Sequence, residues 1–184
     1  MNFAQWFTEM DQQEPLPDAR QFSYIACVLG EVAQRTLEGH AKTWYEEKSG
    51  HSWPSTGWSW RTHHMTVLYR RGGLITEDLE KYRPFFGEDV NLMVTGIAFD
   101  DKCIALTVRP SVSFPIQAAR PHITIAHDSH AVGPEYSNTL LMDNNKIHAV
   151  DGYSVPSVFS AVKKDQKTTW PSRGFAMASP IRVS

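Results

Sequence analysis

Two short segments of this chain repeat one pattern: a histidine and a threonine two residues apart within an apolar run. The copies are His64-Met65-Thr66-Val67 and His122-Ile123-Thr124-Ile125, and none of the other histidines has a threonine at this spacing. Side chains alternate between the two faces of a β-strand. Each copy therefore predicts a strand that presents one imidazole and one hydroxyl on one face and apolar side chains on the other.

Two such strands lying side by side would bring two imidazoles and two hydroxyls to one surface. This set is sufficient for acid–base chemistry on a phosphodiester, because one imidazole can accept a proton while the other donates one. A single copy would have a simpler explanation, since threonine is a common strand residue and short motifs often match by chance. Two copies in similar apolar surroundings favour the catalytic interpretation.

Length and charge limit the classes of protein to consider. The 184 residues suit one domain with a substantial core, and the formal net charge is −2. That charge gives no global positive field to hold a DNA duplex or long RNA without sequence preference. A small or short anionic ligand held by local groups fits the composition better.

Three features lead us to expect a cytoplasmic protein, or one in the host cytoplasm if the source is viral. The N-terminal residues lack the basic and apolar segments of a secretory signal. No stretch reaches the roughly 18 apolar residues of a membrane span, so no membrane association is expected. Cys27 and Cys103 lie in apolar runs, where we expect buried thiols in a reducing compartment.

We expect a single domain over residues 1–184. It comprises an N-terminal arm at 1–21, a core with both motifs at 22–151, and a C-terminal strand and tail at 152–184. Each motif strand precedes a glycine-containing turn and a short helix, a repeat that favours two related lobes. Periodicity predicts strands at 22–29, 62–69, 91–98, 102–108, 122–127, 146–151 and 157–163, helices at 2–10, 31–47, 76–82 and 137–142, and a tryptophan-rich loop at 49–60.

These residues resemble the 2H phosphoesterase superfamily, or LigT-like proteins, which carry two His-x-Thr motifs on paired strands. Pro121 directly precedes the second motif, and Gly133-Pro134 and Ser137-Asn138 follow it, a pattern similar to that of members associated with RNA repair. The resemblance covers approximately residues 22–151. It implies an α+β, bilobal fold in which two antiparallel sheets are related by pseudo-twofold symmetry around a central groove, with helices outside.

The resemblance also implies a phosphodiesterase that needs neither a metal nor another cofactor. Members of the superfamily act on RNA ends with a 2′,3′-cyclic phosphate, on 2′–5′ oligoadenylates or, in phage anti-CBASS nucleases, on cyclic oligonucleotide immune signals. We therefore expect the substrate to be a cyclic nucleotide, a cyclic oligonucleotide or an RNA end. The sequence leaves the choice among them and the oligomeric state open.

The predicted catalytic residues are His64, Thr66, His122 and Thr124. One imidazole would deprotonate the attacking water or ribose 2′-hydroxyl and the other would protonate the leaving oxygen, although the sequence does not assign these roles. The two threonine hydroxyls would donate hydrogen bonds to non-bridging oxygens. His63, next to the first motif, is expected on the opposite strand face in a structural role.

Substrate contacts are predicted for Trp58, Trp60 and Arg120. The tryptophans enter the first motif strand from the preceding loop, where their rings could stack on bases, with core packing as an equal alternative. Arg120 shares strand parity with His122 and could face a phosphate, unless Pro121 interrupts the alternation.

Two other classes of function remain open on sequence grounds. A zinc hydrolase could use His122, His127 and His130, although strand parity separates the first two and no acidic or cysteine ligand lies at a familiar spacing. A non-catalytic cyclic nucleotide- or RNA-binding module would keep the same groove without turnover. Both His-x-Thr pairs are intact, which favours an enzyme.

Overall fold

The chain forms helices and strands close to those that its periodicity predicts. The structure is a computed structural model that describes residues 15–54, 57–165 and 168–171. Its strands are β1 (Phe22–Leu29), β2 (Trp58–Trp60), β3 (His64–Tyr69), β4 (Asp89–Phe99), β5 (Cys103–Pro110), β6 (His122–Asp128), β7 (Ile147–Lys163) and β8 (Thr169–Trp170). The α-helices are α2 (Glu31–Ser49), α3 (Thr76–Tyr82) and α4 (Tyr136–Leu140), and the 3-10 turns are η1 (Ala19–Gln21), η2 (Arg83–Phe85) and η3 (Asn144–Lys146). The helix expected at 2–10 and most of the tail lie outside the described residues.

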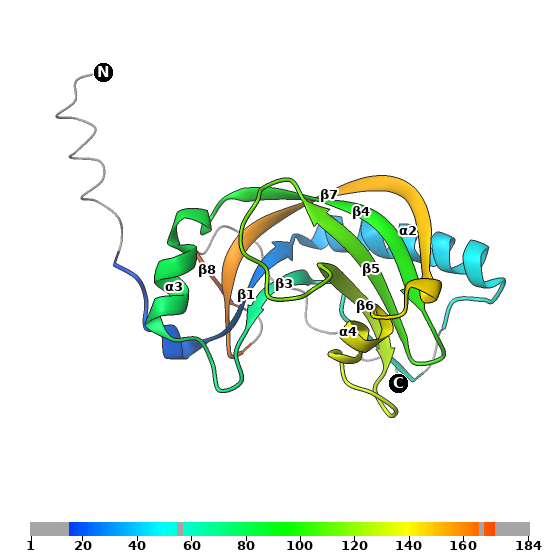
Figure 1. The fold of residues 1–184 in the computed structure, drawn as a ribbon, viewed down its shortest axis with the longest axis horizontal. Coiled ribbons are helices and arrows are strands. Elements are labelled where there is room, and N and C mark those ends of the chain that lie inside the picture. The colour runs from blue at the N-terminus through cyan, green and yellow to red at the C-terminus, as the bar shows by residue number, and fades with distance from the viewer. Residues whose placement is uncertain (1–14, 55–56, 166–167, 172–184) are drawn as a thin grey trace, which may run out of the picture.

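Six of the strands form one closed antiparallel sheet (Figure 1). The order of hydrogen-bonded neighbours is β1, β3, β6, β5, β4 and β7, and β7 pairs again with β1. The short strand β2 adds to β6, and β8 adds to β7. Closure satisfies the backbone groups that an open sheet would leave unpaired along its edges.

The predicted bilobal fold with two separate sheets is wrong. The strands form a closed six-stranded antiparallel barrel with few helices. Two pairings bring this about: β1 bonds to β3 on one side and to β7 on the other, and β3 and β6 meet where Met65 faces Ile123. The two motif strands are therefore neighbours in one sheet, and no free edge divides that sheet into two.

Alternation along the strands separates an apolar face from the face that carries the motifs. On the apolar face, Met65 and Val67 of β3 and Ile123 and Ile125 of β6 are buried in the largest hydrophobic cluster. Helix α2 joins the same cluster through Leu37, Ala41, Trp44 and Tyr45, which recur on one side of the helix. Burial of this face fixes the strand register, because a one-residue slip would expose every core side chain.

Short connections lead from each motif strand into a helix. Gly72 and Gly73 follow β3 with φ of 95° and 105°, a left-handed conformation that favours glycine. Gly133 and Pro134 precede α4, which lies beside β6 (Figure 1). In the described part of the chain, no helix is long and apolar enough to cross a membrane.

Candidate active site

The antiparallel pairing of β3 and β6 brings the two motifs together. Because Met65 faces Ile123 across the pair, the flanking side chains of both motifs project from the opposite face of the sheet. His64, Thr66, His122 and Thr124 all line one groove, whose volume is about 810 Å³. The structure thus places the four predicted catalytic side chains in a common cleft.

His122 has a partner for each ring nitrogen. Nδ1 lies 2.9 Å from the carbonyl oxygen of Arg120, which can only accept, so Nδ1 carries the proton of this hydrogen bond. Nε2 lies 2.9 Å from the hydroxyl oxygen of Ser137, the second residue of α4. These two contacts fix both the position and the orientation of the imidazole.

The Ser137 hydroxyl joins His122 to the threonine of the same motif. Thr124 Oγ1 donates to Ser137 Oγ at 2.9 Å, and Ser137 Oγ donates to the carbonyl of Pro134 at 2.8 Å. With the serine proton directed at Pro134, Nε2 of His122 donates to the serine oxygen and the ring carries both protons. When the ring is neutral, the serine can turn its single proton toward Nε2 instead, so the site accommodates either charge state.

His64 lies in a different environment. Its Nδ1 is buried and has no hydrogen-bond partner among the described residues, which leaves Nε2 as the ring nitrogen available to the groove. The ring packs against Tyr24 of β1, with centroids 4.8 Å apart. Burial, with the nearby positive charges of His63, His122 and Arg61, lowers the pKa of His64 to about 3. A neutral imidazole is therefore the stable form at neutral pH.

Burial also lowers the pKa of His122, but the hydrogen bond to the Arg120 carbonyl acts in the opposite direction. The imidazolium of His122 has an acceptor at each nitrogen, whereas Nδ1 of His64 has none. Burial thus favours the neutral form of both rings, but only His122 has acceptors at both nitrogens to stabilise its imidazolium.

His63 occupies the structural position that strand parity predicts. It is absent from the described residues that line the groove, and its Nδ1 lies 3.2 Å from the side-chain oxygen of Gln34 on α2. The two adjacent histidines therefore lie in different environments, and of this pair only His64 lines the groove.

Arg61 is the one arginine among the described residues that line the groove. Its backbone N–H donates to Ile125 of β6 at 2.7 Å, which anchors the residue beside the second motif strand. The buried Nε of its side chain has no hydrogen-bond partner in the described part of the chain, and none of the ion pairs there involves it. An arginine without a carboxylate partner beside two histidines is suited to bind an anion.

The three residues predicted to contact substrate lie elsewhere. Trp58, Trp60 and Arg120 are not among the described residues that line the groove. The tryptophans form β2 against β6 and pack on the main core, where Trp60 stacks on Trp53 at 5.1 Å. The Arg120 guanidinium hydrogen-bonds to Asn144, so this residue contributes its backbone carbonyl to the site rather than its charge.

Three residues that line the groove were not predicted from the sequence to have a role: Arg61, Tyr69 and Ser137. Arg61 lies three residues before His64, and in a continuous strand this odd spacing would place the two side chains on opposite faces. Arg61 precedes β3, however, so the alternation of that strand does not apply to it and it lines the same groove. Tyr69 ends β3, lines the groove and is 56% exposed as a residue, so a base could stack on its ring. The sequence did mark the position of Ser137, because this residue follows the Gly133-Pro134 turn after the second motif.

The described residues contain no cluster of side chains that fits the zinc site considered from the sequence. No group of three or more histidine, cysteine, aspartate or glutamate side chains lies close enough there to hold a metal ion. His127 is buried on β6 next to Ser59 of β2 and Cys103 of β5.

Comparison with known proteins supplies the family. The chain matches the model of the fungal tRNA ligase phosphodiesterase domain over residues 45–164, a range that includes both motifs and every strand from β2 to β7. No curated protein matches it. This family is a phosphodiesterase family within the 2H phosphoesterases, as the paired motifs predicted. The chain therefore belongs to the fungal tRNA ligase phosphodiesterase domain family and, with it, to the 2H phosphoesterase superfamily.

Proposed function

We propose that this protein hydrolyses the 2′,3′-cyclic phosphate at an RNA end, using two histidines and no metal. The observation that carries the proposal is the placement of His64 and His122 in one groove with different hydrogen-bonding environments. The family supports the substrate class, since its description is that of a tRNA ligase phosphodiesterase domain.

The different environments suggest a division of roles. His64, held neutral, accepts a proton from the attacking water, whose oxygen forms a new bond to phosphorus. The bond from phosphorus to one ribose oxygen then breaks, and that oxygen takes the proton from Nε2 of His122, replacing Ser137 Oγ as the acceptor of this nitrogen. The neutral and charged forms are restored when the proton on His64 returns to His122 through solvent or the product.

Negative charge that develops on the phosphate needs donors in the same groove. The side-chain hydroxyl of Thr66 has no hydrogen-bond partner among the described residues, so it is free to donate to a non-bridging oxygen. The Arg61 guanidinium adds a full positive charge. Thr124 already donates to Ser137, and we therefore assign it to positioning before substrate binds.

The groove dimensions fit the end of a strand better than a long polymer. Its volume of about 810 Å³ lies within the range of about 300–1,000 Å³ for small-molecule sites. The net charge of −2 provides no extended attraction for the rest of an RNA chain. Recognition would then involve the terminal cyclic phosphate and one or two nucleotides, with Tyr69 as a stacking surface.

A substrate panel tests this proposal. The wild-type protein is incubated with a chelator and with RNA bearing a 2′,3′-cyclic phosphate, a cyclic dinucleotide or a cyclic trinucleotide, and the masses of the products are measured. We expect only the RNA end to gain one water. If only the cyclic oligonucleotides are opened, the proposed RNA-end substrate is wrong. A ligand that stays bound and unchanged would indicate a binding module.

A further inference from the structure

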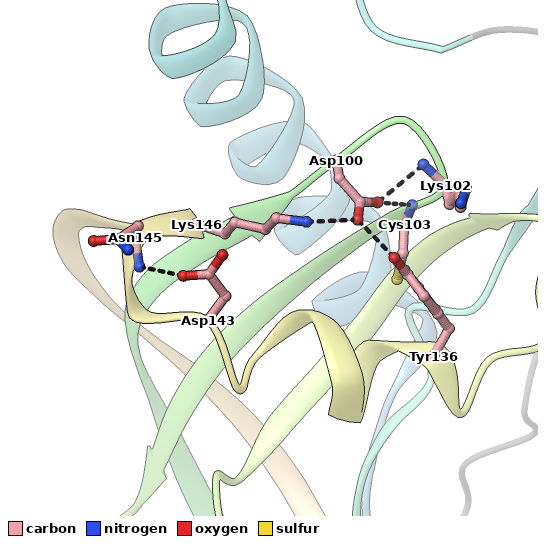
Figure 2. A network of polar contacts seen from close by, with 7 residues as sticks. All are labelled: Asp100, Lys102, Cys103, Tyr136, Asp143, Asn145 and Lys146. Atoms are coloured by element: carbon pink, nitrogen blue, oxygen red, sulfur yellow. Dashed lines mark hydrogen bonds and ion pairs between the residues drawn. The ribbon is translucent and has the colours of Figure 1, made fainter.

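The carboxylate of Asp100 lies in the turn between β4 and β5 and is held firmly there. One oxygen, Oδ1, accepts the backbone N–H groups of Lys102 and Cys103, each at 3.0 Å. The side chain is 12% exposed. Because the turn itself fixes the first oxygen, the second has a defined position from which to hold other parts of the protein (Figure 2).

The second oxygen connects this turn to two segments that follow the second motif. Oδ2 accepts the hydroxyl of Tyr136 at 2.9 Å and lies 3.2 Å from the ammonium group of Lys146. Tyr136 begins α4 and Lys146 ends η3. Figure 2 shows both side chains directed at the one carboxylate from different sides. We refer to Asp100, Tyr136 and Lys146 as the Asp100 network.

One of the two segments held by this network contacts His122 directly, and the other is linked to it through Arg120. Ser137, which follows Tyr136, bonds to Nε2 of His122. In η3, Asn144 accepts a hydrogen bond from the Arg120 guanidinium, and the carbonyl of Arg120 bonds to Nδ1 of His122. Each ring nitrogen of His122 is thus bonded to a residue whose position depends on a segment attached to Asp100.

We propose that Asp100 is a positioning residue for His122, acting through Tyr136 and Lys146 on the two hydrogen-bond partners of the imidazole. The proposal rests on the proposed function, in which His122 donates the proton to the leaving oxygen. Helix α4 has five residues and is too short to be stable alone, so its placement depends on contacts with its surroundings. Apolar packing of Leu140 against the sheet supplies part of that placement, and the tyrosine–carboxylate bond fixes the end that carries Ser137.

Two substitutions isolate the effect. Tyr136→Phe removes only the hydroxyl, and Asp100→Asn removes the charge while keeping an oxygen for the turn. We expect each to lower kcat roughly 10-fold with a small change in KM, because a shift of a catalytic group by a fraction of an ångström has effects of this size. The alkaline limb of the pH–rate profile should move to lower pH, since a displaced Ser137 no longer accepts the second proton of His122.

Asp78→Asn is the matched control. Asp78 is also a buried carboxylate that accepts one backbone N–H, from Ile75, and one arginine, Arg70, but it holds α3 at the far end of β3. We expect it to lower the melting temperature and leave the pH–rate limbs unchanged. If Asp100→Asn and Tyr136→Phe behave in the same way as this control, Asp100 has only a structural role and the proposal is wrong.

An NMR titration of the His122 ring separates this proposal from the proposed function. The other titratable or charged groups that line the groove are Tyr24, Arg61, His64, Tyr69 and Glu135, and all stay unchanged in the two variants. A lower ring pKa in Tyr136→Phe and Asp100→Asn supports the positioning role even if no substrate in the panel is turned over. An unchanged ring pKa overturns it, whether or not the wild type is active.

Discussion

The two His-x-Thr motifs share one sequence pattern but differ in what surrounds each histidine. His122 is bonded at both ring nitrogens to residues outside its strand, whereas His64 has a buried Nδ1 with no partner in the described part of the chain. The motif places a histidine on a strand face, and the segments packed around it determine which hydrogen-bond partners its ring has. In the proposed mechanism this difference lets two motifs of equal sequence serve as an acid and a base.

The largest expected effect comes from removing either imidazole. His64→Ala and His122→Ala should each lower kcat/KM by about 1,000-fold or more, because each removes one of the two proton transfers. The double variant should lose little beyond the single variants, since the two groups act as a unit. Steady-state kinetics on a cyclic-ended RNA measures this, and near wild-type turnover by either single variant would refute the two-histidine mechanism.

The arginines provide the next comparison. Arg61→Met should raise KM or lower kcat/KM by roughly 10- to 100-fold, because it removes the positive charge beside the substrate phosphate. Arg120→Met should cost less, about 10-fold at most and in kcat rather than KM, because the carbonyl that holds His122 is retained and only its tether to Asn144 is lost. The same kinetic assay compares them, and a larger loss for Arg120→Met would restore the side chain of Arg120 as the phosphate ligand.

A smaller difference is expected between the motif threonines. Thr66→Val should cost about 10-fold in kcat, since its hydroxyl is free to donate to the phosphate. Thr124→Val should cost less in kcat and should alter the pH–rate profile, because Thr124 donates to the serine that bonds His122. Equal losses with identical pH profiles would mean that both hydroxyls contact the substrate in the same way.

The environment of His64 also affects stability. Its ring is neutral in the folded protein down to about pH 3 but takes up a proton near pH 6.5 in the unfolded chain. The unfolded chain binds more protons between these values, so the stabilisation is complete above about pH 6.5 and is lost as the pH falls toward 3. Replacing His64 should therefore flatten the dependence of unfolding free energy on pH.

Denaturant titrations across this pH range compare wild type with His64→Gln. The slope should decrease by up to about 1.4 kcal/mol per pH unit, the value for one proton. His130→Gln, on an exposed turn, serves as the control for loss of a histidine. Identical slopes in wild type and His64→Gln would show that the ring is not held neutral by the fold.

The elements of the fold could be predicted from local pattern, but the closure of the sheet could not. The run at Phe22–Leu29 and the helix at Thr76–Tyr82 have the predicted bounds, since their apolar spacing and flanking stops are local signals. The pairing of β1 with β7 joins residues more than a hundred positions apart, and no periodicity encodes it. The strands predicted at 146–151 and 157–163 belong to one continuous strand, β7, because Pro156 lies within this strand without ending it.

The candidate site was predictable where it lies on regular strands. Parity places His64 and His122 in the groove and His63 outside it. It fails for Arg120 because Pro121 separates that residue from the strand, and for Arg61 because the chain bends between β2 and β3. Trp58 and Trp60 belong to a strand of three residues, too short to show a period, and their packing on the core depends on β6.

Hydrolysis in heavy-oxygen water shows whether His64 and His122 together open a cyclic phosphate by addition of water. RNA ending in a 2′,3′-cyclic phosphate is incubated with the wild-type protein and a chelator, and the terminal phosphate is analysed by mass spectrometry. Hydrolysis by His64 and His122 predicts a linear phosphomonoester that carries one heavy oxygen, formed by the wild type and by neither His64→Ala nor His122→Ala. A cyclic end that remains intact with the wild type, or one that both variants open at the wild-type rate, would contradict it.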